Sequence, residues 1–301
     1  MKKLPDVARI ETSGICNFEC IHCPNKEIHT HRPILTNNLF SSIIQQFFEI
    51  KYIPRVAVLY HGGEPLLNKN IFDYIKILKN LGTKKTVITT NASLLDTECA
   101  EKLLKSGLDE IKISFDGKTP EENNFIRKNA NFFKDAQNVI NLIKLQKKIK
   151  THTSIIISNV LILHKDEAKE EILTKKHETP DYLKNYFREY TNNIQYQTFL
   201  AMKWPGLTNA EHLNVIKVKR TSKAQCPALF ETFTILSNGD VAACCYDIKG
   251  EKTFGNIYTN NITDIYYGEK FSTFRSDFIN QKFNKLCLNC TKVNPAYLVY
   301  K

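Results

Sequence analysis

The stretch "GICNFECIHCP" at residues 14–24 places Cys16, Cys20 and Cys23 within eight residues. Three thiolates this close together can bind three corners of a [4Fe-4S] cubane and leave the fourth iron open for another ligand. Zinc normally takes four protein ligands in a structural site, or three and a water in a catalytic one. Because His22 lies inside the motif, a Cys3His zinc site is the alternative interpretation.

Around this motif, short β-branched runs alternate with longer amphipathic stretches as far as about residue 200, which is typical of βα units and a parallel sheet. Helices are expected over 39–50, 70–82 and 99–107, and strands over 7–12, 55–60, 85–90, 110–115, 151–158 and 194–200. Six parallel strands fit an open barrel or a doubly wound sheet. In both, the chemistry gathers at the C-terminal ends of the strands, and the triple-cysteine loop follows the first strand.

The C-terminal part has a different pattern. The run "FTILSNGDVAACC" predicts a β-hairpin around Asn238-Gly239, with Cys244 and Cys245 on its return strand and a helix at about 270–280. Two intervening stretches have weaker patterns. Residues 164–190 are expected to form a solvated helical connection that breaks at Pro180, and residues 203–225 a linker over the mouth of the barrel.

Composition narrows the class of protein. Nine cysteines in 301 residues are too few for a disulfide-stapled domain, and no secretory signal or membrane-spanning apolar stretch occurs. We therefore expect a soluble cytoplasmic protein with no membrane partner, in which clustered cysteines bind metal or carry out redox chemistry.

The formal net charge of +11 admits a solvated Lys-rich surface or the attraction of an anionic substrate or acidic partner. Only seven of the 42 basic residues are Arg, and no nucleic-acid-binding motif is present, which disfavours nucleic acid. A zinc-stabilised nucleic-acid-binding protein is the alternative from a different class, and it predicts salt-dependent binding.

A second motif follows the second expected strand, at the same end of the sheet as the triple-cysteine loop. The sequence "HGGEP" at residues 61–65 directly follows the expected second strand. Together with Cys16, Cys20 and Cys23, it resembles the signature of the radical S-adenosylmethionine (SAM) enzymes. That resemblance implies an α/β fold with a partial (β/α)6 barrel and a [4Fe-4S] cluster whose open iron is chelated by SAM. Reductive cleavage of SAM then gives methionine and a 5'-deoxyadenosyl radical, which abstracts a hydrogen atom from the substrate.

The resemblance also implies SAM-binding roles for the residues at matching positions. His22 occupies the usually aromatic place beside the adenine, and Gly62 and Gly63 let the backbone approach the ligand closely. Glu64 accepts hydrogen bonds from the ammonium region of SAM.

Three further SAM contacts follow from the later strands. Asn91 lies in "TTNA", where Ala92 replaces the usual glycine, and Ser114 lies in "ISFDG". Arg127 is a candidate partner for the methionine carboxylate. The alternatives are ordinary turn and cap chemistry for Asn91, Ser114 and Asp116, and a plain surface role for Arg127.

A fully ligated [4Fe-4S] centre needs four thiolates. Four of the remaining cysteines can supply them: Cys226, Cys244, Cys287 and Cys290. Their surroundings resemble a SPASM or twitch auxiliary domain, a small unit of hairpin and helix, which divides the chain into 1–205 and 206–301. No cysteine follows Cys290, so one auxiliary cluster is expected. A zinc ribbon is the alternative.

Two cysteines lie outside these sets. Cys99 is expected to be a packed helix residue. Cys245 should point away from Cys244 if both lie on a strand, and it could be a core residue, an alternative ligand or a hydrogen donor to a substrate radical.

The resemblance to twitch-type enzymes favours an oxidoreductase of the dehydrogenase type, in which the auxiliary cluster accepts an electron from the substrate radical. The first strand begins within about seven residues of the N-terminus, which leaves no room for a leader-peptide-binding domain, so a sugar, aminocyclitol or nucleotide-like substrate is expected. A peptide maturase and an epimerase are the alternatives. A flavodoxin or ferredoxin is the expected electron donor, and the sequence does not identify the catalytic base.

Overall fold

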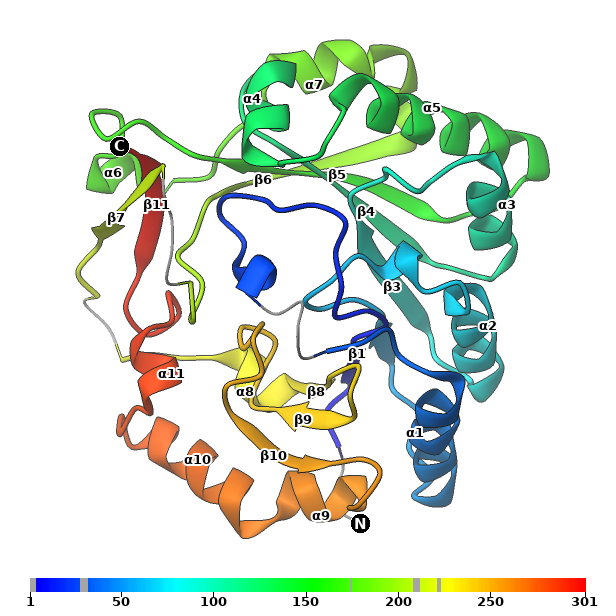
Figure 1. The fold of residues 1–301 in the computed structure, drawn as a ribbon, viewed down its shortest axis with the longest axis vertical. Helices are drawn as coiled ribbons and strands as arrows, with labels where there is room; N and C mark the ends of the chain where they lie inside the picture. Colours follow the sequence, from blue (N-terminus) through cyan, green and yellow to red (C-terminus); the bar gives the residue numbers. More distant parts are fainter. Residues whose placement is uncertain (1–3, 28–31, 174, 208–211, 221–222) are drawn as a thin grey trace.

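The strand order selects between the two architectures that the sequence allows. The computed structural model describes residues 4–27, 32–173, 175–207, 212–220 and 223–301. Its main sheet has nine strands in the order β10-β9-β8-β1-β2-β3-β4-β5-β6. The six parallel strands are β1 (Val7–Ile10), β2 (Val56–Val58), β3 (Lys85–Thr90), β4 (Glu110–Asp116), β5 (Ser154–Leu161) and β6 (Ile194–Leu200). Because the order never reverses, these strands form the curved wall of an open, partial (β/α)6 barrel (Figure 1).

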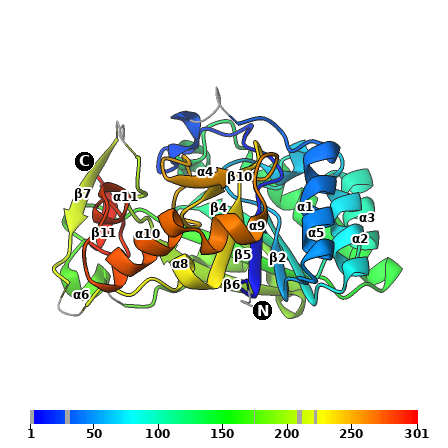
Figure 2. The same cartoon turned by 90° about the horizontal axis from the view of Figure 1, so that it is seen from below.

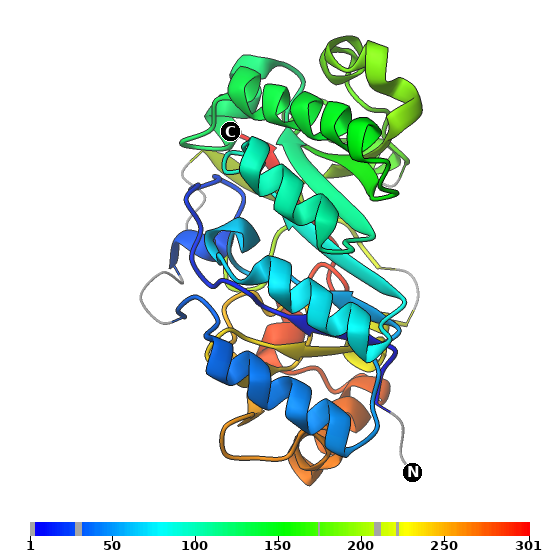
Figure 3. The ribbon, with the colours of Figure 1, turned by 90° about the vertical axis from the view of Figure 1, so that its right-hand side faces the viewer.

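Helices cover the outer face of this wall (Figure 3). The α1 helix (Asn37–Glu49) buries Leu39, Phe40, Ile43 and Phe47, which is the face that its apolar spacing predicts. The α2 helix (Ile71–Leu81) is capped by Gly82, whose φ of 106° lies in the left-handed region that glycine adopts without strain. The other helices and helical turns of this half are α3 (Thr97–Lys105), α4 (Pro120–Ile126), α5 (Phe132–Ile149), η1 (Pro24–Glu27) and η2 (Pro65–Leu67).

Of the two weakly patterned stretches, the first has helices interrupted at Pro180, as the sequence predicts, and the second contains a strand. Among the described residues of 164–190, the short helices α6 (Glu170–Leu173) and α7 (Asp181–Tyr186) lie on either side of Pro180, and the 3-10 turn η3 (Arg188–Asn193) follows. The stretch 203–225, expected as a linker over the mouth of the barrel, contains the strand β7 (Leu213–Lys217), which pairs with β11 (Ala296–Tyr300). That pairing spans some 80 residues of sequence, so local periodicity carries no trace of it; residues 208–211 and 221–222 of the stretch lie outside the described residues.

The C-terminal part closes the open side of the barrel from both edges (Figures 1 and 2). At one edge, β8 (Thr232–Ile235) pairs with β1 in parallel and continues into β9 (Asp240–Ala242) and β10 (Thr253–Asn256). At the other edge, β11 reaches the end of β5 and the residues after β6, through the bridges of Leu163 with Val299 and of Met202 with Tyr297. The remaining helices are α8 (Pro227–Glu231), α9 (Ile262–Tyr267), α10 (Glu269–Ile279) and α11 (Lys285–Leu288).

The predicted hairpin is present, with Gly239 at φ 90° in its turn. The return strand is shorter than predicted. Because β9 ends at Ala242, Cys244 and Cys245 lie beyond the strand in irregular backbone, and their directions are not set by strand alternation. Within the described ranges, no helix combines the length and apolar character that crossing a membrane requires.

One buried carboxylate ties these parts together. Glu11 follows β1 and is fully buried. Its Oε1 accepts hydrogen bonds from Arg32 Nη2 at 3.0 Å and from the backbone N–H of Gly62 at 2.8 Å. Its Oε2 accepts from the backbone N–H and the hydroxyl of Ser237, both at 3.0 Å. The Arg32 guanidinium also donates to the backbone oxygen of Ile248. Glu11 and Arg32 therefore join the barrel to the turn between β8 and β9 and to the loop between β9 and β10.

We predict that Glu11→Gln lowers the free energy of unfolding by about 3–5 kcal/mol, because it leaves Arg32 buried without a counter-charge and turns an amide N–H toward other donors. Anaerobic urea unfolding followed by circular dichroism measures the change. Glu98→Gln is the matched control, since it breaks the exposed pair with Lys102 and should cost less than about 1 kcal/mol. Equal losses in the two variants would contradict the role assigned to Glu11.

Candidate active site at the mouth of the barrel

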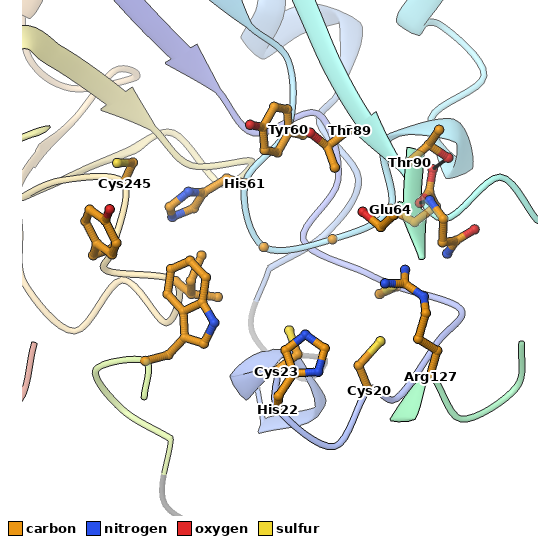
Figure 4. A pocket seen from close by; sticks show the side chains of 18 of the residues that line it. Cys20, His22, Cys23, Tyr60, His61, Glu64, Thr89, Thr90, Arg127 and Cys245 are labelled. Atoms are coloured by element: carbon orange, nitrogen blue, oxygen red, sulfur yellow. Dashed lines mark hydrogen bonds between the residues drawn. The ribbon is translucent and has the colours of Figure 1, made fainter. Parts of the chain in front are cut away.

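A cavity of about 370 Å³ lies at the C-terminal ends of the strands (Figure 4). It collects every residue that the sequence predicts at the SAM site, from five separate segments of the chain. These are Cys16, Cys20, His22, Cys23, Gly62, Gly63, Glu64, Asn91, Ser114 and Arg127. Segments up to about 110 residues apart in sequence therefore contribute to one site.

The cysteine loop is held by backbone contacts with the end of α4. The N–H groups of Glu19 and Ile21 donate to the carbonyls of Lys128 and Ile126, and the Phe18 and Ile21 side chains are buried beneath the loop. Burial raises the pKa of all three thiols of the loop, that of Cys16 to about 11. Iron binds the thiolate, so cluster assembly at this loop releases protons.

The donor set of the loop fits an iron–sulfur cluster better than a single ion. Within the described ranges, no three His, Cys, Asp or Glu side chains converge on one point as the ligands of one metal ion do. A cubane does not require that convergence, because each thiolate binds a different iron. His22, the fourth ligand in the zinc alternative, instead has its Nε2 3.9 Å from the carboxylate of Asp116.

The two glycines of "HGGEP" are required by contacts within the protein. A Cβ on Gly63 would lie 2.2 Å from the backbone oxygen of Ile15, and one on Gly62 would lie 2.4 Å from Arg32 Nη2. The N–H of Glu64 donates to that same Ile15 oxygen at 2.8 Å. The sequence predicts close approach to a ligand at these positions, whereas the structure shows close packing against the cysteine loop and the Glu11–Arg32 pair.

Glu64 connects two of the predicted motifs. Its buried carboxylate accepts hydrogen bonds from the Thr90 hydroxyl at 2.7 Å and from the N–H groups of Asn91 at 2.9 Å and Leu66 at 3.0 Å. Burial raises the pKa of Glu64, and these donors oppose the shift. The carboxylate therefore fixes the "HGGEP" loop against the end of β3.

The turn after β3 shows the cap chemistry that the sequence leaves open as an alternative. Asn91 Oδ1 accepts from the N–H and the hydroxyl of Ser93, and its Nδ2 donates to Asn17 Oδ1 at 2.9 Å. Ala92 has a φ of 62°, in the left-handed region. The residue that replaces the usual glycine thus occupies a conformation that glycine favours.

Arg127 is not a surface residue. Its side chain is only 9% exposed, and its Nη1 lies 2.9 Å from Asp116 Oδ2. The guanidinium carbon is 5.6 Å from the centre of the Phe18 ring, and Nε has no hydrogen-bond partner among the described residues. Arg127 and Asp116 therefore form a buried pair beside Cys20, with donor capacity left on the arginine.

A second, smaller cavity collects the other predicted ligand set. Cys226, Cys244, Cys287 and Cys290 all line it. Burial raises the pKa of each thiol, that of Cys287 to about 12 and that of Cys290 to about 11. The rest of the wall is mostly apolar and includes Leu229, Phe274, Phe278 and Leu286. Four thiols in an apolar enclosure are the donor set of a fully ligated cluster.

The adjacent cysteines Cys244 and Cys245 face different cavities. Cys244 lines the small cavity, whereas Cys245 lines the large one with His61 and Trp204. Tyr246 lines both cavities and so separates them. Cys99 lies in α3 and packs against the core, as the sequence predicts.

Sequence reasoning missed several residues of the large cavity. Arg9, Tyr60, His61, Trp204 and Tyr246 all line it. A signal existed for Arg9, because strand alternation places it opposite the buried Ala8 and Ile10. Trp204 and Tyr246 reach the cavity through packing between distant segments, which no local pattern reveals.

Comparison with known proteins identifies the family. The model of the radical SAM superfamily matches residues 10–176. The chain belongs to the radical SAM superfamily. A second model, that of the iron-sulfur cluster-binding SPASM domain, matches residues 226–291. The predicted cofactors are thereby confirmed for this radical SAM enzyme: a [4Fe-4S] cluster, SAM and auxiliary iron–sulfur ligation.

Curated relatives are similar over part of their length. The GTP 3',8-cyclase of Limosilactobacillus fermentum is 26% identical over 67% of this chain and 56% of its own. The AdoMet-dependent heme synthase of Methanosarcina barkeri is 27% identical over 42% of this chain and 36% of its own. The chain thus spans about half or less of these relatives.

Two solved structures share the fold over nearly the whole chain. BtrN in complex with AdoMet and 2-DOIA gives a TM-score of 0.59 at 17% identity, covering 96% of this chain and 94% of BtrN. Streptococcus suis SuiB bound to precursor peptide SuiA gives 0.59 at 18% identity, covering 97% of this chain and 70% of SuiB. At such low identity, these likenesses establish the architecture alone.

We predict that anaerobic reconstitution yields about eight irons per chain, and that replacing Cys16, Cys20 and Cys23 together by Ala reduces this to about four. Iron and acid-labile sulfide analysis measures both values. The neighbouring cysteines provide a matched pair: Cys244→Ala should disturb the second cluster, whereas Cys245→Ala should retain all iron. Iron loss of the same size in both variants would refute the separation of their roles.

We also predict that Gly63→Ala weakens SAM binding at least tenfold, because its Cβ would displace the backbone of the cysteine loop at Ile15 and Ser13. Equilibrium binding of SAM to the reconstituted, unreduced enzyme measures the effect. Gly107→Ala serves as the control, since Gly107 also limits substitution, through a positive φ, but lies after α3 and does not line the cavity. Unchanged SAM binding in Gly63→Ala would contradict this account.

Proposed function

We propose that this radical SAM enzyme is an oxidoreductase that removes hydrogen from a small polar substrate. The observation that carries the proposal is the arrangement of the two thiol sets. Three thiols open into a large cavity, four are enclosed in a small apolar one, and Tyr246 lies between them. Such a pair of sites suits hydrogen abstraction in the first and electron removal through the second.

Each residue set has a separate task in this proposal. Cys16, Cys20 and Cys23 hold the first cluster, and bound cluster and SAM together supply the radical that abstracts a substrate hydrogen. Glu64 and Arg127 orient SAM through the ammonium and carboxylate groups, and His22 lies beside its adenine. Glu64 and Arg127 are buried, whereas the three cysteines and His22 are half-buried and face the cavity.

Further SAM contacts come from Asn91 and Ser114 at the ends of β3 and β4. Gly62 and Gly63 keep the loop after β2 free of side chains at this cavity. We divide the chain functionally at residue 205, with 1–205 as the radical SAM barrel and 206–301 as the auxiliary domain.

The auxiliary site supplies the oxidising side of the reaction. Cys226, Cys244, Cys287 and Cys290 would hold a cluster with no open iron, which would accept an electron rather than bind the substrate. The substrate radical would lose a proton to a base, which the sequence does not identify, and give its remaining electron to this cluster. The electron donor to the first cluster is a flavodoxin or ferredoxin, and the net charge of +11 favours an acidic protein of this kind. Such donors are found in the cytoplasm, where we place the enzyme.

Cavity size and charge favour a small substrate. A volume of about 370 Å³ is at the low end for ligand pockets, and SAM takes part of it. Arg9 and Arg127 line the cavity, which suits a neutral polyol or an anionic compound such as a nucleotide. The relatives named above are consistent with this class, since GTP is a nucleotide, although SuiB was solved with a peptide.

Redox-neutral chemistry is the second candidate, and one observation favours it. Cys245 lines the large cavity rather than the small one, so its thiol could return a hydrogen atom to a substrate radical. An epimerase acting on a small molecule or peptide would use the thiol in this way.

We predict that Cys245→Ala preserves substrate turnover, because an oxidation needs no hydrogen donor. The test is an anaerobic screen of sugars, aminocyclitols, nucleotides and peptides for 5'-deoxyadenosine release above the substrate-free background, with mass spectrometry of the product in deuterated water. A product two hydrogens lighter than substrate, without solvent deuterium, supports the dehydrogenase. A product of unchanged composition that carries one deuterium, and is lost in Cys245→Ala, identifies the epimerase instead.

A further inference from the structure

The histidine that opens the "HGGEP" motif has a position that the SAM-binding roles do not use. His61 is 9% exposed and lines the large cavity. In Figure 4, Tyr60, His61 and Cys245 lie along one side of the cavity, and Cys20, His22 and Cys23 lie along the other. His61 is therefore on the side away from the cluster loop.

The hydrogen-bond partner of the imidazole determines its tautomer. Nε2 of His61 lies 3.1 Å from the backbone oxygen of Asp247. A carbonyl oxygen can only accept, so Nε2 must carry the hydrogen. In the neutral ring, Nδ1 is then an acceptor. Nδ1 is buried and has no hydrogen-bond partner among the described residues.

The surroundings keep the ring neutral. Burial, and then the positive charges of Arg9 and Arg32, hold the pKa of His61 well below its usual range. Arg9 is anchored nearby, because its Nη1 donates to the backbone oxygen of Tyr60 at 3.0 Å and its guanidinium lies over the Tyr60 ring. A neutral acceptor beside two fixed cations is the result.

A buried acceptor without a donor is costly, by about 1–3 kcal/mol, and natural structures keep few such groups. Since this acceptor belongs to a side chain that lines a ligand cavity, a donor on the ligand would remove the cost. SAM can be assigned to the opposite side, with the cysteine loop, Glu64 and Arg127. The donor facing His61 then belongs to the substrate.

We infer that His61 is a substrate-binding residue whose Nδ1 accepts a hydrogen bond from a hydroxyl group of the substrate. This inference rests on the proposed function and narrows its substrate class to alcohols. An ammonium group could also donate, but Arg9 and Arg32 would repel its charge. His61 thus selects a neutral hydroxyl at this position and orients the carbon that bears it.

Two substitutions separate the two nitrogens of the ring. In His61→Gln, the amide nitrogen can take the place of Nε2 and still donate to Asp247, but no acceptor remains at the place of Nδ1. In His61→Asn, the amide oxygen can take the place of Nδ1, and the contact with Asp247 is lost. A purely structural role predicts that Gln is the milder change, whereas our inference predicts that Asn is the milder change for substrate binding.

The experiment measures binding without turnover. Wild-type enzyme and both variants, reconstituted with clusters and SAM but without reductant, are titrated with scyllo-inositol, scyllo-inosamine, glucose, guanosine and GTP. For the compounds that bind, we expect His61→Gln to raise Kd about tenfold or more, and His61→Asn to raise it less. SAM affinity and the thermal midpoint of His61→Gln should match wild type, which excludes a folding defect.

A deoxy analogue of the best ligand completes a double-mutant cycle. Removing the contacting hydroxyl should weaken binding to wild type by the same factor, and should have little effect on His61→Gln. The role of His61 would be overturned if His61→Gln and removal of the ligand hydroxyl lowered the affinity independently of each other. It would also be overturned if a ligand with the hydroxyl bound equally well to wild type and to His61→Gln. Tighter binding of an analogue in which an ammonium group replaces that hydroxyl would overturn it as well.

The same panel distinguishes failure of the inference from failure of the proposed function. With reductant present, a compound that stimulates the release of 5'-deoxyadenosine from SAM supports the proposed substrate class, whether or not His61 contacts that compound. If none binds wild type or stimulates release, the small-alcohol substrate class is refuted, and the inference about His61 with it.

Discussion

The site depends on one buried carboxylate. Glu11 accepts hydrogen bonds from Arg32, Gly62 and Ser237, which belong to the loop after the cysteines, the "HGGEP" motif and the C-terminal hairpin. Hydrogen bonds to a buried, ionised carboxylate are short and strong, and they fix the positions of their donors. Glu11 therefore sets the positions of three segments that each carry functional residues, and it makes the C-terminal region part of the barrel rather than an appendage.

This coupling explains how two thiol sets can be arranged around one small cavity. The hairpin that Glu11 holds through Ser237 leads directly to Cys244 and Cys245, and irregular backbone turns these neighbours toward different cavities. The same region supplies the Asp247 carbonyl that sets the tautomer of His61. A few consecutive residues, 244–247, thus contribute to both cavities and to the hydrogen bonding of His61.

The sequence predicted those parts of the site that short motifs encode. Cysteine spacing and the position of "HGGEP" after the second strand were sufficient for the family, the cofactors and those cavity residues that lie in or match a motif, but not for the other residues that line the cavity. The structure adds a reason for the glycine pair, because Gly62 and Gly63 also lie close to Arg32 and Ile15, which no spacing in the sequence places there. Arg127 could be read as a surface residue, because its ion pair with the buried Asp116 is a contact of the folded chain that no local pattern shows.

By itself, the sequence determined the βα alternation, the barrel helices and the two sets of thiols, because apolar periodicity and ligand spacing are local properties of the chain. Only the tertiary structure decided that β8 extends the barrel sheet beside β1, that β7 pairs with β11, and that Tyr246 lies between two cavities. The tautomer of His61 belongs to this second group. These features depend on contacts between residues some 80 to 230 positions apart, and such contacts arise from packing and hydrogen bonding of the folded chain, which leave no periodic trace in the sequence.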